Sequence, residues 1–173
     1  ALAMAEVTPP RPGPDWRKEL LGLFRRYRLA VRRHPNIAAV VGTQLLSNES
    51  PDPAFIEAVL VLLETAGFKD SELVHAYNVV IAAMVGFVTM ELASPPAEDP
   101  QEWAQTHETH MKSLPAGSHP TLARHLPKLM RHAFIVRSSN GLEHPMNESF
   151  EVWASVFLDG LASRLEKSVG RTV

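Results

Sequence analysis

The chain has 173 residues, of which 45% are hydrophobic and 21% charged, and its formal net charge is -2. These values are typical of one ordinary globular domain, and the weak acidity is not that of a basic nucleic-acid-binding module. The absence of cysteine excludes disulfide scaffolds, zinc fingers, iron–sulfur sites and cysteine nucleophiles.

The first element expected along the chain is a long helix that follows a proline-rich segment. Residues 8–14 contain four prolines, so no helix can cross them. Asp15 is a suitable N-cap, and apolar residues then recur at helical spacing. The helix is expected to end at His34, because Pro35 disfavours helical backbone in the residue before it. A short helix is expected over residues 36–43.

The bounds of the remaining helices are predicted from residues that typically start or end a helix. Asp52 and Pro53 have the pattern of a helix start, and Gly67 that of a left-handed C-cap. Strand signals are almost absent, so the predicted fold class is all-α. The helices after the loop at 47–53 are expected over residues 53–66, about 70–93, 102–111, 121–132 (with Pro127 as a defect) and 147–167.

The helices expected over 70–93 and 147–167 carry apolar residues on more than one side. A helix that is apolar all round must be buried all round. The simplest solution is a twofold dimer in which these two helices pair with their copies as a four-helix bundle. The alternative is that both are central helices of a monomer. The residues assigned to the dimer interface are Val74, Ile81, Val85, Val88, Trp153, Val156, Phe157 and Leu161.

The most apolar window, residues 73–92, is not expected to span a membrane. It contains polar residues such as His75, Asn78 and Glu91, and its uninterrupted apolar part covers about half a bilayer. Residues 1–7 lack the basic leader of a signal peptide. The expected compartment is the cytoplasm.

Catalytic motifs are missing, so the chain is predicted not to be an enzyme and to need no cofactor. The Glu72–His75 spacing matches one Glu-x-x-His unit, whereas a di-iron site needs two. His107 and His110 share a helix face and are the weak candidates for a metal, with solvated surface favoured. For the basic residues of the first helix, a solvated face is favoured over contacts with DNA phosphates; they are Arg25, Arg26, Arg28, Arg32 and Arg33.

Several segments, taken in order, resemble the C-terminal regulatory domain of TetR-type transcriptional repressors. The matching pieces are Asp15-Trp16-Arg17, Tyr27-Arg28, His34-Pro35, Gly67-Phe68, Phe150-Glu151 and the run from Phe157 to Leu161. Their order and spacing cover the chain from Asp15 to about Lys167.

The resemblance implies an organisation of the whole protein. A DNA-binding helix-turn-helix domain would precede Ala1, and residues 1–7 would end the helix that connects the two domains. Residues 1–14 are then connecting helix and linker, 15–168 the effector-binding and dimerisation domain, and 169–173 a tail. The family dimerises through its last two long helices, and an effector in a cavity among the central helices changes the separation of the DNA-reading heads.

The resemblance also suggests an effector site. Tetracycline repressors have a magnesium-binding His where this chain has Val40, three residues before Thr43, so an apolar or aromatic effector is expected instead. Each assigned residue has an alternative role without an effector. Thr43 could cap a helix with its hydroxyl, and Asn78 could bond to a neighbouring side chain. The large apolar residues could simply pack in the core, and Trp103 could anchor a loop. The assigned residues are Phe24, Tyr27, Thr43, Tyr77, Asn78, Met84, Phe87 and Trp103.

The predicted function is that of the effector-binding, dimerising domain of a TetR-like regulator, with a repressor role expected. Its partners would be a second copy and a small molecule, and operator DNA only through the domain upstream of Ala1. The alternative is a stand-alone helical ligand-binding or scaffold protein.

Overall fold

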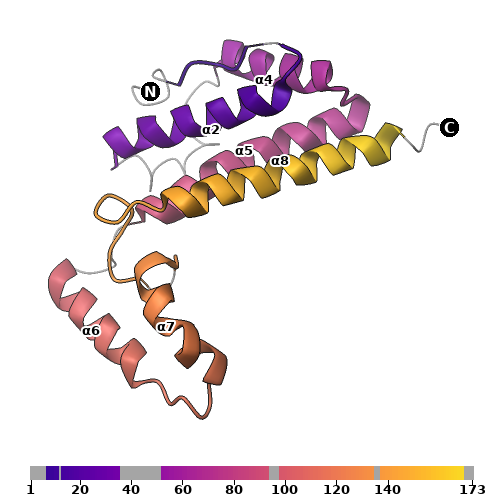
Figure 1. Cartoon of the computed structure of the whole chain (residues 1–173). Coiled ribbons are helices and arrows are strands. Elements are labelled where there is room, and N and C mark those ends of the chain that lie inside the picture. Colours follow the sequence, from indigo (N-terminus) through magenta and orange to yellow (C-terminus); the bar gives the residue numbers. More distant parts are fainter. Residues whose placement is uncertain (1–6, 12, 36–51, 94–97, 135–136, 170–173) are drawn as a thin grey trace. The chain divides into compact units, whose positions relative to one another are not determined.

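A computed structural model of the chain describes residues 7–11, 13–35, 52–93, 98–134 and 137–169. Within these ranges it contains six α-helices and no strand, which confirms the all-α prediction (Figure 1). The helix expected over 36–43 lies outside the described residues. The helices are α2 (Trp16–Arg33), α4 (Pro53–Ala66), α5 (Asp70–Leu92), α6 (Pro100–Ser113), α7 (Pro120–His132) and α8 (Asn147–Val169).

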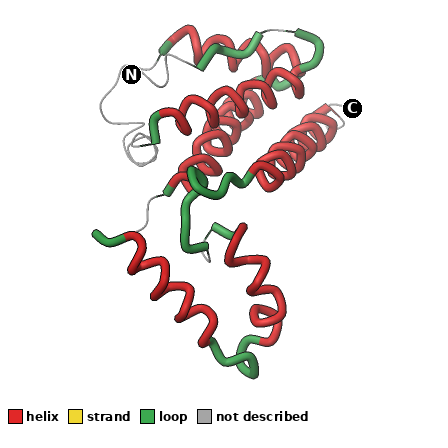
Figure 2. The backbone as a smooth tube through the Cα atoms, turned by 60° about the vertical axis from the view of Figure 1, so that its left-hand side comes forward, coloured by secondary structure: helices red, strands yellow, loops and turns green. Residues whose placement is uncertain are grey.

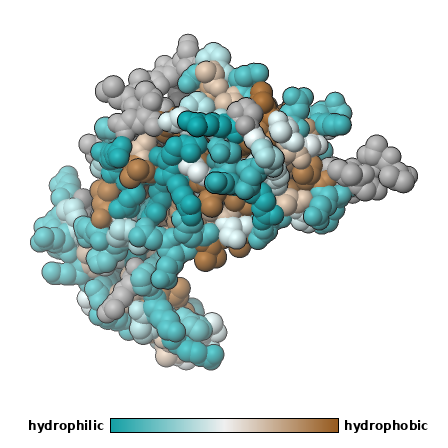
Figure 3. Space-filling view, turned by 45° about the horizontal axis from the view of Figure 1, so that its top comes forward, coloured by the Kyte–Doolittle hydropathy of each residue, from teal (hydrophilic) through white to brown (hydrophobic). Residues whose placement is uncertain are grey.

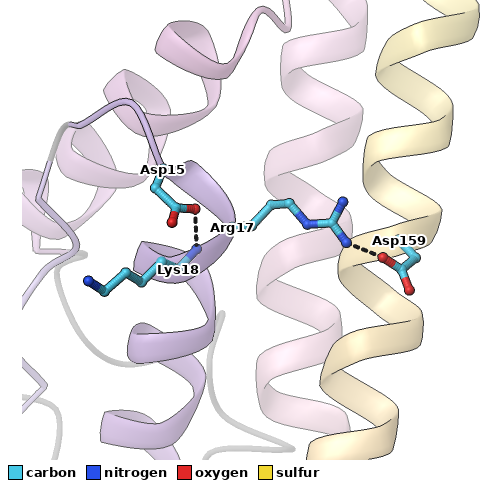
Figure 4. Close-up of polar contacts among 4 residues, drawn as sticks. All are labelled: Asp15, Arg17, Lys18 and Asp159. Carbon is cyan, nitrogen blue, oxygen red and sulfur yellow. Dashed lines mark hydrogen bonds and ion pairs between the residues drawn. The ribbon is translucent and has the colours of Figure 1, made fainter.

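Local capping sets several of the helix ends. The Asp15 carboxylate accepts a hydrogen bond from the Lys18 N–H at 3.0 Å (Figure 4), and Asp52 caps α4 in the same manner. Gly67 ends α4 in the left-handed conformation with φ of 114°, which glycine adopts without the steric cost of a Cβ. These ends were predicted from the sequence and are confirmed.

The chain divides into two compact units. The first unit, here called the bundle, comprises Ala1–Thr89 and Asn147–Val173 and therefore contains α2, α4, most of α5 and α8. The second unit, here called the lobe, is Met90–Met146 and contains the last turn of α5 together with α6 and α7.

In the bundle, α5 and α8 lie side by side and run in opposite directions (Figures 1 and 2). Glu72 near the start of α5 pairs with Arg164 near the end of α8, and Phe87 contacts Phe150 at the opposite ends. α2 contacts both α4 and α8. The side chains buried between these helices include Leu20, Leu23, Val31, Val59, Leu62, Leu63, Phe68, Val80 and Leu158.

In the lobe, α6 and α7 form a helical hairpin without a closed core of its own. None of their described side chains is fully buried. Buried polar groups gather instead where α5 ends: the Arg137 guanidinium donates to the carbonyls of Met90 and Glu91. The Gly141 N–H also donates to the Glu91 carbonyl, at 2.8 Å. The Met146 N–H donates to the Glu91 carboxylate at 3.0 Å.

We call these four residues, Glu91, Arg137, Gly141 and Met146, the Glu91 clasp. Glu91 is fully buried and Arg137 nearly so. Burial lowers the pKa of Arg137, and the nearby Glu91 carboxylate opposes that effect. The clasp satisfies carbonyls that the last turn of α5 would otherwise leave unpaired, and it ties that turn to the segment that leads into α8.

Candidate functional site

Five aromatic rings from three helices of the bundle form one continuous cluster. Trp153 of α8 lies at its centre, 5.2 Å from the ring of Phe24 on α2 and 5.1 Å from the ring of Phe87 on α5. Phe150 and Phe157, one turn to either side of Trp153, complete the cluster. Tilted and edge-on aromatic pairs at these distances stabilise a core beyond the area that they bury.

The cluster turns one apolar stripe of α8 towards the interior of the chain. Trp153 and Phe157, both assigned to the dimer interface from the sequence, make their ring contacts within the chain and are half-buried. Leu161 and Val88, assigned to the same interface, are only 5% and 1% exposed. Four of the eight assigned residues therefore pack largely or wholly within the bundle.

A different apolar surface of α5 and α8 remains exposed. Val74 and Val79 on α5 are 55% and 49% exposed, and Val152 and Val156 on α8 are 63% and 66% exposed. Figure 3 shows hydrophobic side chains visible between hydrophilic ones on one face of the molecule. We call these four valines the α5–α8 face.

The α5–α8 face overlaps the predicted interface only in part. Val74 and Val156 belong to both, and the assigned Ile81 and Val85 are half-buried. A Cβ added at Gly86 of α5 or Gly160 of α8 would meet no atom within 4 Å. The prediction missed Val79 and Val152. The i,i+4 spacing of Val152 and Val156 is a signal that could have found Val152.

A groove of about 560 Å³ lies between α5 and α8 at the Gly160 end of this face. Its polar lining includes His75 and Arg164, and the Arg164 guanidinium donates to both carboxylate oxygens of Glu72, at 3.0 and 3.1 Å. The remaining lining residues are Ala76, Val79, Val156, Phe157, Gly160 and Leu161. Three of the predicted interface residues thus line one groove, and none of the predicted effector-site residues that the structure describes does.

α5 is long and apolar enough to span a membrane, with a mean hydropathy of 1.8 over its most apolar window. Only 28% of that window is buried in the chain. The paired Glu72 and the exposed His75 and Asn78 lie on this helix. These polar groups favour a helix that packs against protein over one that lies in lipid.

Basic side chains of α2 pair with α8. Arg25 donates to both carboxylate oxygens of Glu151, at 3.0 and 2.7 Å, and Arg17 pairs with Asp159 (Figure 4). The hydrogen bond from Arg25 lowers the pKa of Glu151, and the same contact raises the pKa of Arg25. Arg28 donates to the Asn147 side chain at 2.9 Å.

The Arg25 side chain stays 54% exposed in its pair, so the basic side chains of α2 are solvated, as expected, and also make contacts within the chain. Arg26 also has a partner, because its Nε donates to the Thr8 carbonyl at 3.0 Å. Most of the basic run therefore makes contacts within the chain. The partners on α8 lie more than a hundred positions away in the sequence, which is why spacing within α2 does not reveal them.

The predicted effector-site residues fall into several environments. Phe24, Met84, Phe87 and Tyr27 are buried in the bundle, and burial raises the pKa of Tyr27 to about 12. Tyr77 is half-buried, and burial raises its pKa as well. Asn78 is exposed, so its amide needs no buried partner in the single chain. Thr43 lies outside the described residues.

The remaining candidates lie in the lobe. Trp103 of α6 is half-buried and stacks on His107 with ring centroids 4.9 Å apart. His110 is exposed. In the described ranges of the chain, no group of three His, Asp or Glu side chains is placed to hold a metal ion.

Comparison with known proteins then decides the family. The family model described as "Tetracyclin repressor-like, C-terminal domain" matches residues 8–165. The chain belongs to this family. The match covers α2, α4, α5, α6 and α7 and most of α8, so it includes both the aromatic cluster and the α5–α8 face. No match was found among curated proteins or among solved structures.

The tetracycline-repressor-like family assignment agrees with the all-helical fold. It supports a regulatory domain that binds a ligand and dimerises. The helices that the resemblance assigned to dimerisation, the last two long ones, are α5 and α8.

Proposed function

We propose that residues 15–168 form the effector-binding and dimerisation domain of a cytoplasmic TetR-like transcriptional repressor. DNA would be bound by a helix-turn-helix domain that precedes these residues in the full protein. The effector would be a small apolar or aromatic molecule, and the domain would carry out no catalysis. The observation that carries the proposal is the family match over residues 8–165, together with the exposed α5–α8 face.

The exposed valines support dimerisation through α5 and α8. Four valines about half or more exposed on two adjacent helices are an apolar surface that association would remove from water. A twofold axis would bring the same surface of two chains together, giving a bundle of four helices. Gly86 and Gly160 leave room for a neighbouring helix, because no atom of the chain occupies the space of a Cβ there.

The aromatic cluster supports an apolar or aromatic effector. Phe24 and Phe87 reach the same tryptophan from two different helices, and Tyr27 is buried on α2 one turn beyond Phe24. An effector among these side chains would gain apolar contacts, with Tyr27 and Tyr77 as hydroxyl partners. Binding there would alter how α2 and α5 pack on α8, and α8 carries part of the α5–α8 face.

The dimer is tested by replacing one valine of the face with a charged residue. Val156→Glu places a carboxylate in the proposed interface, where association would bury it without a partner. Leu29→Glu is the matched control, because Leu29 is 51% exposed on α2, outside the α5–α8 face. Analytical ultracentrifugation should show a dimer for the unmodified chain and the control, and a monomer for Val156→Glu.

The outcome that contradicts the proposed interface is a Val156→Glu chain that remains dimeric. Val156 is a better probe than Phe157, which contacts Phe24 and Trp153 and whose replacement would also damage the bundle core. Circular dichroism of each variant confirms that a loss of association does not reflect unfolding.

The effector class is tested by thermal shift against hydrophobic antibiotics, acyl compounds and dyes. A ligand of the folded state at a hundred times its dissociation constant stabilises it by about 2.7 kcal/mol. Binding near the cluster should also change the fluorescence of Trp153. That change should be lost in Trp153→Phe, whereas Trp103→Phe should retain it. A thermal shift without a change in Trp153 fluorescence would place the ligand elsewhere.

A further inference from the structure

Residues 7–11, which precede α2 in the chain, lie along that helix. The Arg26 Nε donates to the Thr8 carbonyl at 3.0 Å, and the Arg11 N–H donates to the Glu19 carboxylate at 3.1 Å. Thr8 therefore meets a later turn of α2 than Arg11 does, so the segment runs antiparallel to the helix (Figure 1). We propose that residues 7–11, here called the strap, are held on α2 by Arg26 and Glu19, so that the chain enters the bundle along a path fixed to this helix.

The strap depends on α2 for hydrogen bonds of its own backbone. Pro9 and Pro10 have no N–H, and the strap forms neither helix nor strand. The two backbone groups that bind α2 side chains, the Thr8 carbonyl and the Arg11 N–H, flank these prolines. Val7 is 4% exposed, and Pro10 is buried as well. Because proline also fixes φ, this segment has few conformations to lose when it docks.

The α2 residues at the strap share one face of the helix. Glu19, Gly22 and Arg26 are spaced i, i+3 and i+7, which places them in line along a helix. Gly22 lies in the interior of α2, where glycine is less favourable than alanine. A Cβ added at Gly22 would lie 2.9 Å from Nη1 of Arg26. The glycine therefore leaves the space in which the guanidinium lies when it binds the strap.

The strap gives α2 a second set of contacts, away from α8. Another side of α2 pairs with α8 through Arg17 and Arg25, and Phe24 contacts Trp153 in the aromatic cluster. An effector that alters how α2 packs on α8 would therefore displace the strap together with α2. This consequence rests on the proposed function, in which a DNA-binding domain precedes the bundle and the strap lies between that domain and α2.

The first test is amide exchange of Arg11, measured by NMR on the 173-residue chain, with circular dichroism to confirm that each variant stays folded. Glu19→Ala should speed this exchange by about tenfold, because the amide loses a hydrogen bond to a charged group. Glu19→Gln keeps an acceptor and should restore part of the protection. Arg26→Ala removes a contact to Thr8 alone, yet it should speed Arg11 exchange by about threefold or more, because the strap is released as a unit. Lys18→Ala is the matched control: it removes an exposed cation of α2 outside the strap contacts and should leave the exchange unchanged.

A spin label on the strap gives a second readout. The chain has no cysteine, so Thr8→Cys provides a single attachment site and keeps the backbone carbonyl that Arg26 binds. The nitroxide should be immobilised when position 26 is arginine and mobile in the Arg26→Ala background. Gly22→Ala should also mobilise the label, but should add nothing to Arg26→Ala, because the methyl group acts through the guanidinium.

The outcomes separate this inference from the proposed function. Equal exchange of the Arg11 amide in the unmodified chain and in Glu19→Ala overturns the strap. An Arg26→Ala chain with both readouts unchanged also overturns it, because apolar burial alone would then hold the segment. An equal effect of Gly22→Ala in both backgrounds overturns the part assigned to the glycine. None of these readouts needs DNA, so a docked strap in a full protein that binds no DNA would overturn the proposed function and leave the strap standing.

Discussion

Replacing Gly141 with Ala should destabilise the lobe by adding one methyl group to the Glu91 clasp. A Cβ at position 141 would lie 2.3 Å from Cγ and 2.9 Å from Cδ of Glu91, and 2.9 Å from the Glu91 carbonyl oxygen. None of these atoms can move aside easily, because Glu91 is 0% exposed and its carboxylate accepts the Met146 N–H. The glycine is required here by close approach, since its φ is not in the left-handed region.

The magnitude follows from two contributions. Forcing an extra carbon into a packed site costs about 1–3 kcal/mol. If the segment moves away to relieve the overlap, the hydrogen bond from the Gly141 N–H to the Glu91 carbonyl is lost, which costs a further 0.5–1.5 kcal/mol, roughly. We therefore expect the free energy of unfolding to fall by about 2–4 kcal/mol, corresponding to a decrease in Tm of about 5–15 °C for a chain of this size.

Urea denaturation gives the change in free energy, and hydrogen exchange at residues 137–146 shows where protection is lost. Gly117→Ala is the control, because a Cβ there would meet no atom within 4 Å and the change should stay within about 0.5 kcal/mol. In a Glu91→Ala background, Gly141→Ala should cost less, because Cγ and Cδ are then missing. Equal stability of Gly141→Ala and Gly117→Ala would refute the packing described for the clasp.

Three further predictions concern the bundle. Phe24→Ala should lower the free energy of unfolding by about 3–5 kcal/mol in urea denaturation, because Phe24 is buried against Trp153 and Phe157. The control Leu29→Ala, on the exposed side of α2, should change the free energy of unfolding by less than about 0.5 kcal/mol. Similar losses for both variants would contradict the cluster. The pKa of Glu151 is lowered in the folded state, so the pair with Arg25 contributes stability above the pKa of an unfolded carboxyl group and loses it as the pH falls through the lowered value. Because both side chains are about half exposed, Glu151→Gln should cost at most about 1 kcal/mol near neutral pH, and a larger loss would show that the contact is stronger than an ordinary surface ion pair. Burial raises the pKa of Tyr27 to about 12, so the contribution of Tyr27 to stability is fully present below about pH 10 and is lost as the pH rises towards 12. In Tyr77→Phe, Tyr27 is the one remaining tyrosine, and ultraviolet titration should show its phenol ionising together with unfolding. Ionisation of Tyr27 near pH 10 in a folded chain would contradict its burial.

Much of the fold was predictable because its signals are local. Asp15 and Asp52 cap helices through hydrogen bonds to backbone groups two or three residues away. Gly67 ends α4 because of its own backbone conformation. Such interactions depend on neighbours in the sequence, so residue type and spacing reveal them. The order and spacing of short sequence pieces between Asp15 and Leu161 were also sufficient to recognise the tetracycline-repressor-like family.

The choice of helix face was less predictable. α5 and α8 are apolar on several sides, so helical periodicity alone does not say which side faces inward. The structure decides it by bringing Phe24 and Phe87 against Trp153, which turns that stripe of α8 inward and leaves Val152 and Val156 exposed. The sequence had placed Trp153 and Val156 together in one interface.

By itself, the sequence determined an all-helical chain with most helix ends, the family, and two helices too apolar for their surroundings. The tertiary structure alone decided three other features: the inward stripe of α8, the pairing of Arg17 and Arg25 with carboxylates on α8, and the clasp around Glu91. The physical reason is the range of the interactions. Caps act over two to four residues, whereas these contacts join groups separated by 46 to 142 positions, and only the folded chain brings them together.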